Sequence, residues 1–249
     1  MRPPYNRRMR VGIERDAPTL ARVPRLLLPG PYRTAGAVLL AGCVAVAVVV
    51  RLLFLGGPLY PYRGQAGWLS SAVDPWLQAA LRPFPALLRW LPDLGTLKPV
   101  ALMTLALILA CAAARRWPGA VLAAVAVPAA SGLTEYVLKP LVGRPAGQPG
   151  FPSGHATIMF ALAAICAVLL LDPPSRRVPG AIRLILVLLA LLVAAAVAAA
   201  MVAIGAHFFT DAVAGAAVGT GVVLACALTL DLAASRVRRG PAAPPASAG

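Results

Sequence analysis

The sequence contains few charged residues for its length, and lysine and histidine are almost absent from it. Charged side chains make up 12% of the 249 residues, whereas 60% of the residues are hydrophobic. This composition excludes an ordinary soluble domain and indicates an integral membrane protein. The only lysines are Lys98 and Lys139, and the only histidines are His155 and His207. Arginine supplies most of the net charge of +15, and because the arginines cluster at the ends of apolar runs, we expect no nucleic-acid partner.

The four cysteines do not indicate a disulfide framework. Each of them lies inside an apolar run, at Cys43, Cys111, Cys166 and Cys226. Cysteines in such surroundings are usually small hydrophobic residues, so we expect free thiols. Residues 40–43, Leu-Ala-Gly-Cys, are similar to a lipoprotein cleavage site, but the apolar run continues beyond them. We therefore expect an uncleaved first helix.

Six apolar stretches are long enough to cross a bilayer, which needs about 20 residues of helix. They are residues 35–55, 94–114, 118–138, 154–171, 181–204 and 208–232. The sequence therefore predicts an all-α integral membrane protein with six transmembrane helices. An even number of spans puts both termini on the same side of the membrane.

The distribution of basic residues predicts the orientation of these spans. If the N-terminus is inside, the inner segments hold 16 Lys and Arg residues and the outer segments hold 6. Inner segments are normally the more basic ones, so we expect a multi-pass protein of the cell (inner) membrane with both termini in the cytoplasm. His155 and His207 then lie at outer span ends, and a site built on them faces the periplasmic or extracellular side.

Composition also divides the chain into parts. Residues 1–33 and 235–249 are rich in Arg, Pro or Ala, and we expect them to be disordered cytoplasmic tails around a membrane domain of residues 34–234. Within that domain, residues 57–93 form an outer segment with Trp68 and Trp76 at helical spacing. This pattern fits a helix in the headgroup layer, and it fits equally a helix packed on the spans.

The outer loop before the fourth span has the composition of a phosphate-binding loop. Lys139 and Arg144 supply positive charge, and an arginine can bind two oxygens of one anion. Ser153 and Gly154 come directly before the apolar run that starts the fourth span. The free N–H groups at a helix start bind anions, a serine there can cap the helix or bond a phosphate oxygen, and a glycine permits close approach.

The two histidines have neighbours that suit them for different roles. His207 and Asp211 are four residues apart at the start of the sixth span, so they share one helical face. An aspartate bonded to one ring nitrogen fixes the tautomer and leaves the other nitrogen free to attack phosphorus. His155, at the start of the fourth span, can then protonate the departing oxygen.

Pro152-Ser153-Gly154-His155 followed by His207-x-x-x-Asp211 resembles the type 2 phosphatidic acid phosphatase (PAP2) superfamily, which also includes vanadium-dependent haloperoxidases. The resemblance implies a helical bundle of the PAP2/haloperoxidase kind and a phosphatase that acts on lipid phosphates without metal or cofactor. It implies that His207 forms a phosphohistidine, that Asp211 orients it and that His155 protonates the leaving group. The implied phosphate ligands are Lys139, Arg144, Ser153 and Gly154.

The sequence departs from the family pattern at two places. The usual first motif has Arg-Pro after Lys and six further residues, but Ala146 stands there, and Arg144 arrives two residues early. The usual third motif has Ser-Arg where this chain has Ala200 and Met201. Because one preorganised donor contributes about 2.7–4 kcal/mol to the transition state, we expect lower activity, a different donor or another substrate.

Other interpretations of these residues remain open at this point. The same chemistry fits a lipid phosphotransferase, and the missing arginines fit a non-catalytic protein that binds or transports a lipid phosphate. His207 and Asp211 also have the spacing of zinc ligands, but no third strong ligand other than His155 lies nearby, so we expect no metal.

Two further features each have two explanations. Glu135 lies one helical turn before Lys139 and can be a functional acid, but a local ion pair is favoured. Gly215 and Gly219 have the spacing of small residues at a helix–helix contact, which can form a homodimer face but is expected to serve packing within the chain.

Overall fold

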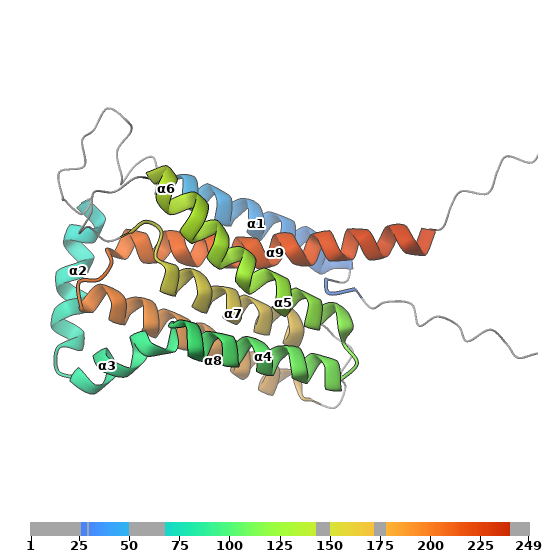
Figure 1. Cartoon of the computed structure of the whole chain (residues 1–249), viewed down its shortest axis with the longest axis horizontal. Helices are drawn as coiled ribbons and strands as arrows, with labels where there is room; N and C mark the ends of the chain where they lie inside the picture. The colour runs from blue at the N-terminus through green and yellow to red at the C-terminus, as the bar shows by residue number, and fades with distance from the viewer. Residues whose placement is uncertain (1–25, 29, 50–67, 143–149, 172–177, 240–249) are drawn as a thin grey trace, which may run out of the picture.

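The computed structural model describes residues 26–28, 30–49, 68–142, 150–171 and 178–239, and in these residues all regular structure is helical. The helices are α1 (Gly30–Val49), α2 (Trp68–Leu81), α3 (Pro85–Leu94), α4 (Leu97–Ala113), α5 (Trp117–Gly132), the π-helix η2 (Leu133–Leu138), α6 (Lys139–Val142), α7 (Gly154–Leu171), α8 (Gly180–Ala203) and α9 (Phe209–Arg239). The long helices run side by side as a bundle, and α2 and α3 lie across one end of it (Figure 1). Most of the predicted tails, at residues 1–25 and 240–249, lies outside the described residues.

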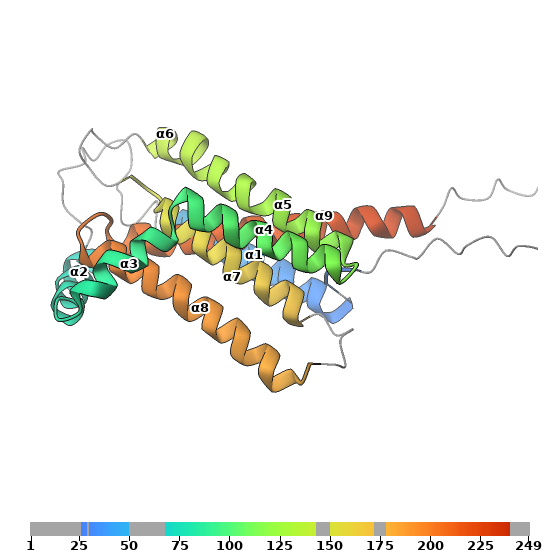
Figure 2. The ribbon, with the colours of Figure 1, turned by 60° about the horizontal axis from the view of Figure 1, so that its bottom comes forward.

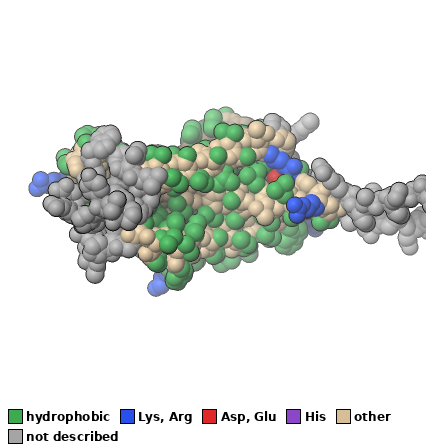
Figure 3. Space-filling view, turned by 90° about the horizontal axis from the view of Figure 1, so that it is seen from above, with side chains coloured by type: hydrophobic (Ala, Val, Ile, Leu, Met, Phe, Trp, Pro, Cys, Tyr) green, Lys and Arg blue, Asp and Glu red, His purple; other side chains and the backbone are tan. Residues whose placement is uncertain are grey.

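The described chain is a multi-pass membrane protein, as the sequence predicts. Within the described residues, five helical segments are long and apolar enough to cross a membrane, and the number is six if the bent pair α3–α4 forms one span. The five are Tyr32–Val49, Trp117–Val142, Gly154–Leu171, Gly180–Ala203 and Phe209–Val237. Figure 3 shows a side of the bundle on which hydrophobic side chains predominate, with the few Lys and Arg side chains in view lying toward its ends.

The second predicted span differs from the others because it is bent. The axes of α3 and α4 form an angle of 58°. The bend falls at Gly95 and Thr96, where the amides of both residues and the Thr96 hydroxyl bond back to the last turn of α3. Helix α3 therefore leads into α4 without a long loop.

Helix α7 lies at the centre of the bundle and packs closely against α9 (Figures 1 and 2). A Cβ atom at Gly215 would lie 2.5 Å from the Ser153 carbonyl oxygen, and one at Gly219 would collide with the carbonyl of Thr157. The two glycines thus allow the backbones of α7 and α9 to approach each other. This contact confirms the expectation that they serve packing within the chain.

The bundle has two distinct ends. We call the end at which α7 and α9 begin the site end, because it holds the residues discussed below. At the opposite end, Arg116 donates to the carbonyl of Leu169 at 2.6 Å, near the last residue of α7. There Asp231, which is buried, accepts the amides of Leu27 and Leu28 at 2.6 and 2.7 Å. The Asp231 carboxylate therefore fixes the chain just before α1 to α9.

Of the two interpretations of the outer segment 57–93, its described part fits packing on the spans. Ser70 and Asp74 of α2 are buried against the start of α9. Trp76 of α2 and Trp90 of α3 are 66% and 69% exposed. The four cysteines are free, as predicted.

Candidate active site

The start of α7 is capped by Ser153, which is buried. Its hydroxyl accepts the amide of Ala156 at 3.4 Å, the usual contact of a capping side chain. Its carbonyl accepts the amide and the hydroxyl of Thr157 at 3.0 and 2.9 Å. Within the described residues, the amides of Gly154 and His155 have no hydrogen-bond partner. These N–H groups and the helix dipole make the start of α7 suitable for an anion.

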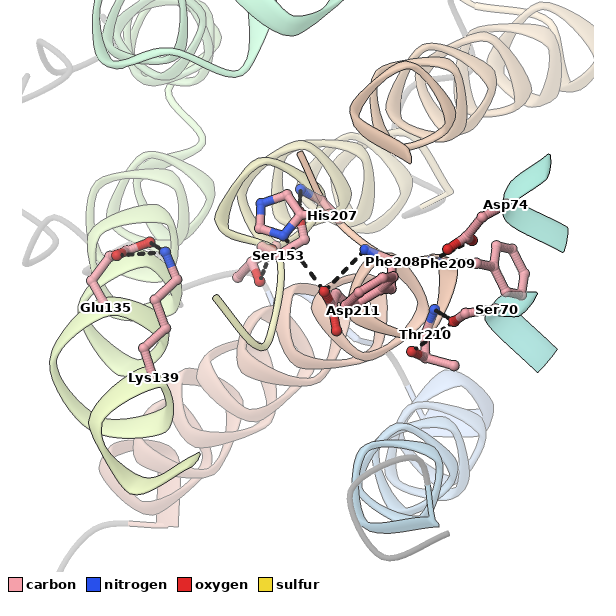
Figure 4. Close-up of polar contacts among 12 residues, drawn as sticks. Ser70, Asp74, Glu135, Lys139, Ser153, His207, Phe208, Phe209, Thr210 and Asp211 are labelled. Atoms are coloured by element: carbon pink, nitrogen blue, oxygen red, sulfur yellow. Dashed lines mark hydrogen bonds and ion pairs between the residues drawn. The ribbon is translucent and has the colours of Figure 1, made fainter. Parts of the chain in front are cut away.

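An ion pair lies directly against this helix start. The Lys139 ammonium group donates to both carboxylate oxygens of Glu135, at 2.6 and 2.7 Å (Figure 4). A Cβ atom at Gly154 would lie 2.6 Å from Glu135 Oε1 and 3.7 Å from Lys139 Nζ. The local Glu135–Lys139 pair expected from the sequence is therefore confirmed. Because Gly154 has no side chain, this pair can lie close to the start of α7. Glu135 lies in η2, and π-helical turns occur often at functional sites.

His207 lies between two helix ends that hold its backbone in place. Helix α8 ends at Ala203 and is followed by Gly205, whose φ of 75° is a left-handed conformation that glycine adopts without strain. The amides of Ala206 and His207 both donate to the carbonyl of Met201, at 3.0 and 3.2 Å. The bonds of Gly205 and Ala206 are those of the glycine-terminated helix end known as the Schellman motif. His207 is thereby fixed just before α9 begins.

His207 and Asp211 face each other across the first turn of α9. The distance from His207 Nδ1 to Asp211 Oδ2 is 3.7 Å, and Asp211 is fully buried. The same Oδ2 accepts the amide of Phe208 at 3.1 Å. His207 Nδ1 has no hydrogen-bond partner within the described residues, so the pair has the right arrangement but is looser than a hydrogen bond. Such contacts often shorten when substrate binds.

The starts of α7 and α9 form one site. The Ser153 amide donates to the backbone carbonyl of Asp211 at 3.0 Å, which links the two helices directly. His155 lies in the first turn of α7, and the charges of His207, Lys139 and Glu135 act on its ring. Six of the seven predicted site residues therefore lie together at the site end. The seventh, Arg144, is outside the described residues.

Sequence reasoning missed three residues that shape this site. Gly95, at the α3–α4 bend, packs against the ring of His155, and a Cβ atom there would collide with that ring. On α2, Ser70 and Asp74 bond to the start of α9 (Figure 4). Burial raises the pKa of the Asp74 carboxyl, and the nearby charge of Asp211 raises it further, while the hydrogen bond from the Phe209 amide lowers it. The sequence did contain one indication that Asp74 has a specific role, because it is one of only eight acidic residues in the chain.

Comparison with known proteins finds a similarity to one family. The sequence model of the PAP2 superfamily matches residues 127–233. The match covers less than half of the chain, and residues 127–233 are similar to this superfamily. No curated protein and no solved structure matches the chain. The PAP2 region extends from the second half of α5 into α9, so α1 to α4 lie outside it.

The PAP2 region of this chain has few cations at its site. Ala200 and Met201, which stand where the family pattern has Ser-Arg, are buried in α8. In the described part of the region, positive charge next to the start of α7 comes from Lys139, which is paired with Glu135. No group of three or more His, Cys, Asp or Glu side chains that could hold a metal ion occurs in the described residues.

Proposed function

We propose that this protein is a membrane phosphatase that hydrolyses a lipid phosphate through a phosphohistidine intermediate. The main support is that the starts of α7 and α9 lie together at one end of the bundle. One carries the His207–Asp211 pair, and the other presents open amides beside Lys139. A nucleophile next to an anion-binding helix start is the arrangement that phosphoryl transfer requires.

The proposed reaction has two steps. In the first, Nε2 of His207 attacks phosphorus, the bond from phosphorus to the leaving oxygen breaks, and His155 donates a proton to that oxygen. Asp211 stabilises the positive charge that develops on the His207 ring. In the second step, His155 removes a proton from water, the water oxygen attacks phosphorus, and the bond from phosphorus to His207 breaks.

The phosphate oxygens would be held at the start of α7. Ser153 shapes the turn that presents the N–H groups of Gly154 and His155. There these N–H groups can stabilise negative charge, and Lys139 supplies a cation. Arg144 is assigned the same task by its place in the family motif. No step requires a metal ion.

An apolar groove beside the site supports a substrate with a long hydrocarbon chain. The groove has a volume of about 470 Å³ and lies between α1, η2 and α9. One end is formed by Phe151 and Pro152, directly before Ser153, and its floor follows α9 from Ala214 to Ala225. That stretch measures about 16 Å at the helical rise per residue, close to half of a bilayer core of about 30 Å. We assign the groove to the hydrocarbon chain of the substrate, with the phosphate at α7.

The proposed location is the cell (inner) membrane, with the site end on the periplasmic or extracellular side. This orientation rests on the excess of basic residues in the segments at the opposite end of the spans. A labelling reagent that cannot cross the membrane, applied to a cysteine introduced at the exposed Trp76, should react in intact spheroplasts.

The direct test of the function is phosphate release by the purified full-length chain in detergent. The substrates should include a phosphatidic acid, a phosphatidylglycerol phosphate and a polyprenyl diphosphate. We expect release from at least one of them, loss of release in His207→Ala, and no effect of EDTA. Full activity in His207→Ala, or complete loss with EDTA, would contradict the mechanism. Transfer of the phosphoryl group to a second alcohol would show a phosphotransferase, and binding without turnover would show a binding protein.

A further inference from the structure

The first turn of α9 is held by a helix that lies far from it in the sequence. Asp74 Oδ1 accepts the amide of Phe209 at 3.0 Å, and Ser70 Oγ accepts the amide of Thr210 at 3.3 Å. The hydroxyls of Ser70 and Thr210 lie 3.0 Å apart and share a hydrogen bond. Ser70, Asp74 and Thr210 are all buried, and Figure 4 shows the contacts between them and the start of α9. We call these contacts the α2–α9 clasp.

The clasp replaces a cap that α9 does not have in its own sequence. The residue before α9 is Phe208, whose side chain cannot accept a hydrogen bond. Free amides at a helix start need acceptors, which normally come from a Ser, Thr, Asp or Asn at the capping position. Here the amide of Phe208 is taken by Asp211, and those of Phe209 and Thr210 are taken by α2.

The location of the clasp connects it to the chemistry. His207 comes directly before Phe208, and Asp211 lies in the turn that the clasp closes. The His207 Nδ1 to Asp211 Oδ2 distance of 3.7 Å has no hydrogen bond to fix it, so the backbone of this turn sets the separation of the two groups. Both α2 residues lie outside the PAP2 region.

We propose that Asp74 and Ser70 are positioning residues, which set the position of the His207–Asp211 pair through the first turn of α9. This inference rests on the proposed function for its kinetic consequences, but its structural consequence can be measured without activity. Helix α2 then helps to set the geometry of the site, in addition to packing on the bundle.

A purely structural contribution is the alternative, and the chain offers a matched control for it. Asp231 lies at the opposite end of α9 and is also buried, and its carboxylate accepts two backbone amides, whereas that of Asp74 accepts one. If Asp74 only stabilised the fold, Asp74→Ala and Asp231→Ala would have the same kind of effect. Asp74→Asn is the conservative variant, because asparagine caps a helix as well as aspartate does.

The kinetic experiment compares these variants in kcat and KM for a lipid phosphate, per folded protein. We expect Asp74→Ala to lower kcat about 100-fold, the size of effect that follows from an error of about 1 Å in placing a reacting group. KM should stay unchanged, because the start of α7 is not touched, and Asp74→Asn should restore most of kcat. Ser70→Ala should lower kcat less than Asp74→Ala and gives the same test if Asp74→Ala fails to fold. Asp231→Ala should lower thermal stability while kcat stays unchanged.

The second measurement uses the fact that the chain has only two histidines. Nitrogen NMR of the full-length chain with labelled histidine gives ring signals for His155 and His207 alone. We expect Asp74→Ala and Ser70→Ala to shift the His207 signals and to leave those of His155 in place, and Asp231→Ala to move neither. Unchanged His207 signals in Asp74→Ala and Ser70→Ala, or the same fall in kcat for Asp74→Ala and Asp231→Ala, would overturn the inference. An absence of turnover in the unmodified chain would refute the proposed function alone, since the NMR result does not depend on it.

Discussion

The starts of α7 and α9 lie next to each other, but their backbone amides are in opposite states. At α9, the amides of Phe208, Phe209 and Thr210 all donate to side-chain oxygens within the protein. At α7, the amides of Gly154 and His155 have no partner among the described residues. One helix start is thus closed to an external anion, and the other is open to it.

From this difference we infer that the starts of α7 and α9, which each carry one histidine, have different roles. A helix start whose amides are bonded within the protein keeps its side chains in place, which suits the proposed nucleophile His207 and its partner Asp211. An open helix start can bind a phosphate, which suits the turn that carries Ser153 and Gly154. In this account, kcat depends mainly on the start of α9, and binding of the phosphate depends mainly on the start of α7.

The largest effect is expected from a change at the closed start. Asp211→Asn keeps the size of the side chain but can present its amide group to His207 Nδ1, which favours the wrong tautomer of the ring. The same change in the catalytic triad of a serine protease lowers kcat about 10⁴-fold, and we expect a fall of this order here with little change in KM. A steady-state assay of phosphate release measures it. An equal change in KM and kcat would contradict the proposal that the start of α9 acts mainly on kcat.

A change at the open start should have a smaller effect. Lys139→Met removes the cation beside α7, and a hydrogen bond to a charged group contributes about 1.5–3 kcal/mol, which corresponds to about 10- to 150-fold in kcat/KM. The matched control is Lys98→Met, which removes the other lysine of the chain, an exposed residue of α4. The same assay, run for both variants, should show the loss in Lys139→Met alone. Equal activity of the two variants would exclude Lys139 from phosphate binding.

The smallest effect concerns the side of α9 on which the hydrocarbon chain lies. Ala217 lines the groove that ends at Phe151, whereas Ala216 lines a smaller apolar pocket of about 190 Å³ between α8 and α9. Ala217→Leu should displace about two methylenes of the bound chain, worth roughly 1.6 kcal/mol, and so lower kcat/KM about tenfold. The loss should appear with a long-chain substrate and not with a short-chain one. A larger loss of kcat/KM in Ala216→Leu than in Ala217→Leu would place the hydrocarbon chain of the substrate in the pocket between α8 and α9.

Much of the fold was predictable because its causes are local. The length of an apolar run determines whether a helix can span a membrane, and five of the predicted spans coincide closely with described helices. The Glu135–Lys139 pair followed from its spacing on one helix. The gathering of the two histidines at one end followed from the alternating direction of successive spans.

The parts that were not predictable depend on contacts between distant residues. Asp74 and Phe209 are 135 residues apart, and no pattern within α2 indicates which helix start its carboxylate reaches. The contact of Gly95 with the His155 ring requires the 58° bend between α3 and α4, which the apolar pattern does not reveal. The place of the Glu135 carboxylate against Gly154 likewise depends on how η2 packs on α7.

The most direct test of the central claim is to trap the covalent intermediate. A turnover reaction with a lipid substrate radiolabelled in its phosphate is stopped with strong base, and the label on the protein is measured. We expect labelled protein whose label survives base, is lost in acid and maps to His207, and no label in His207→Ala. Turnover without labelled protein, or equal labelling of His207→Ala, would contradict the account.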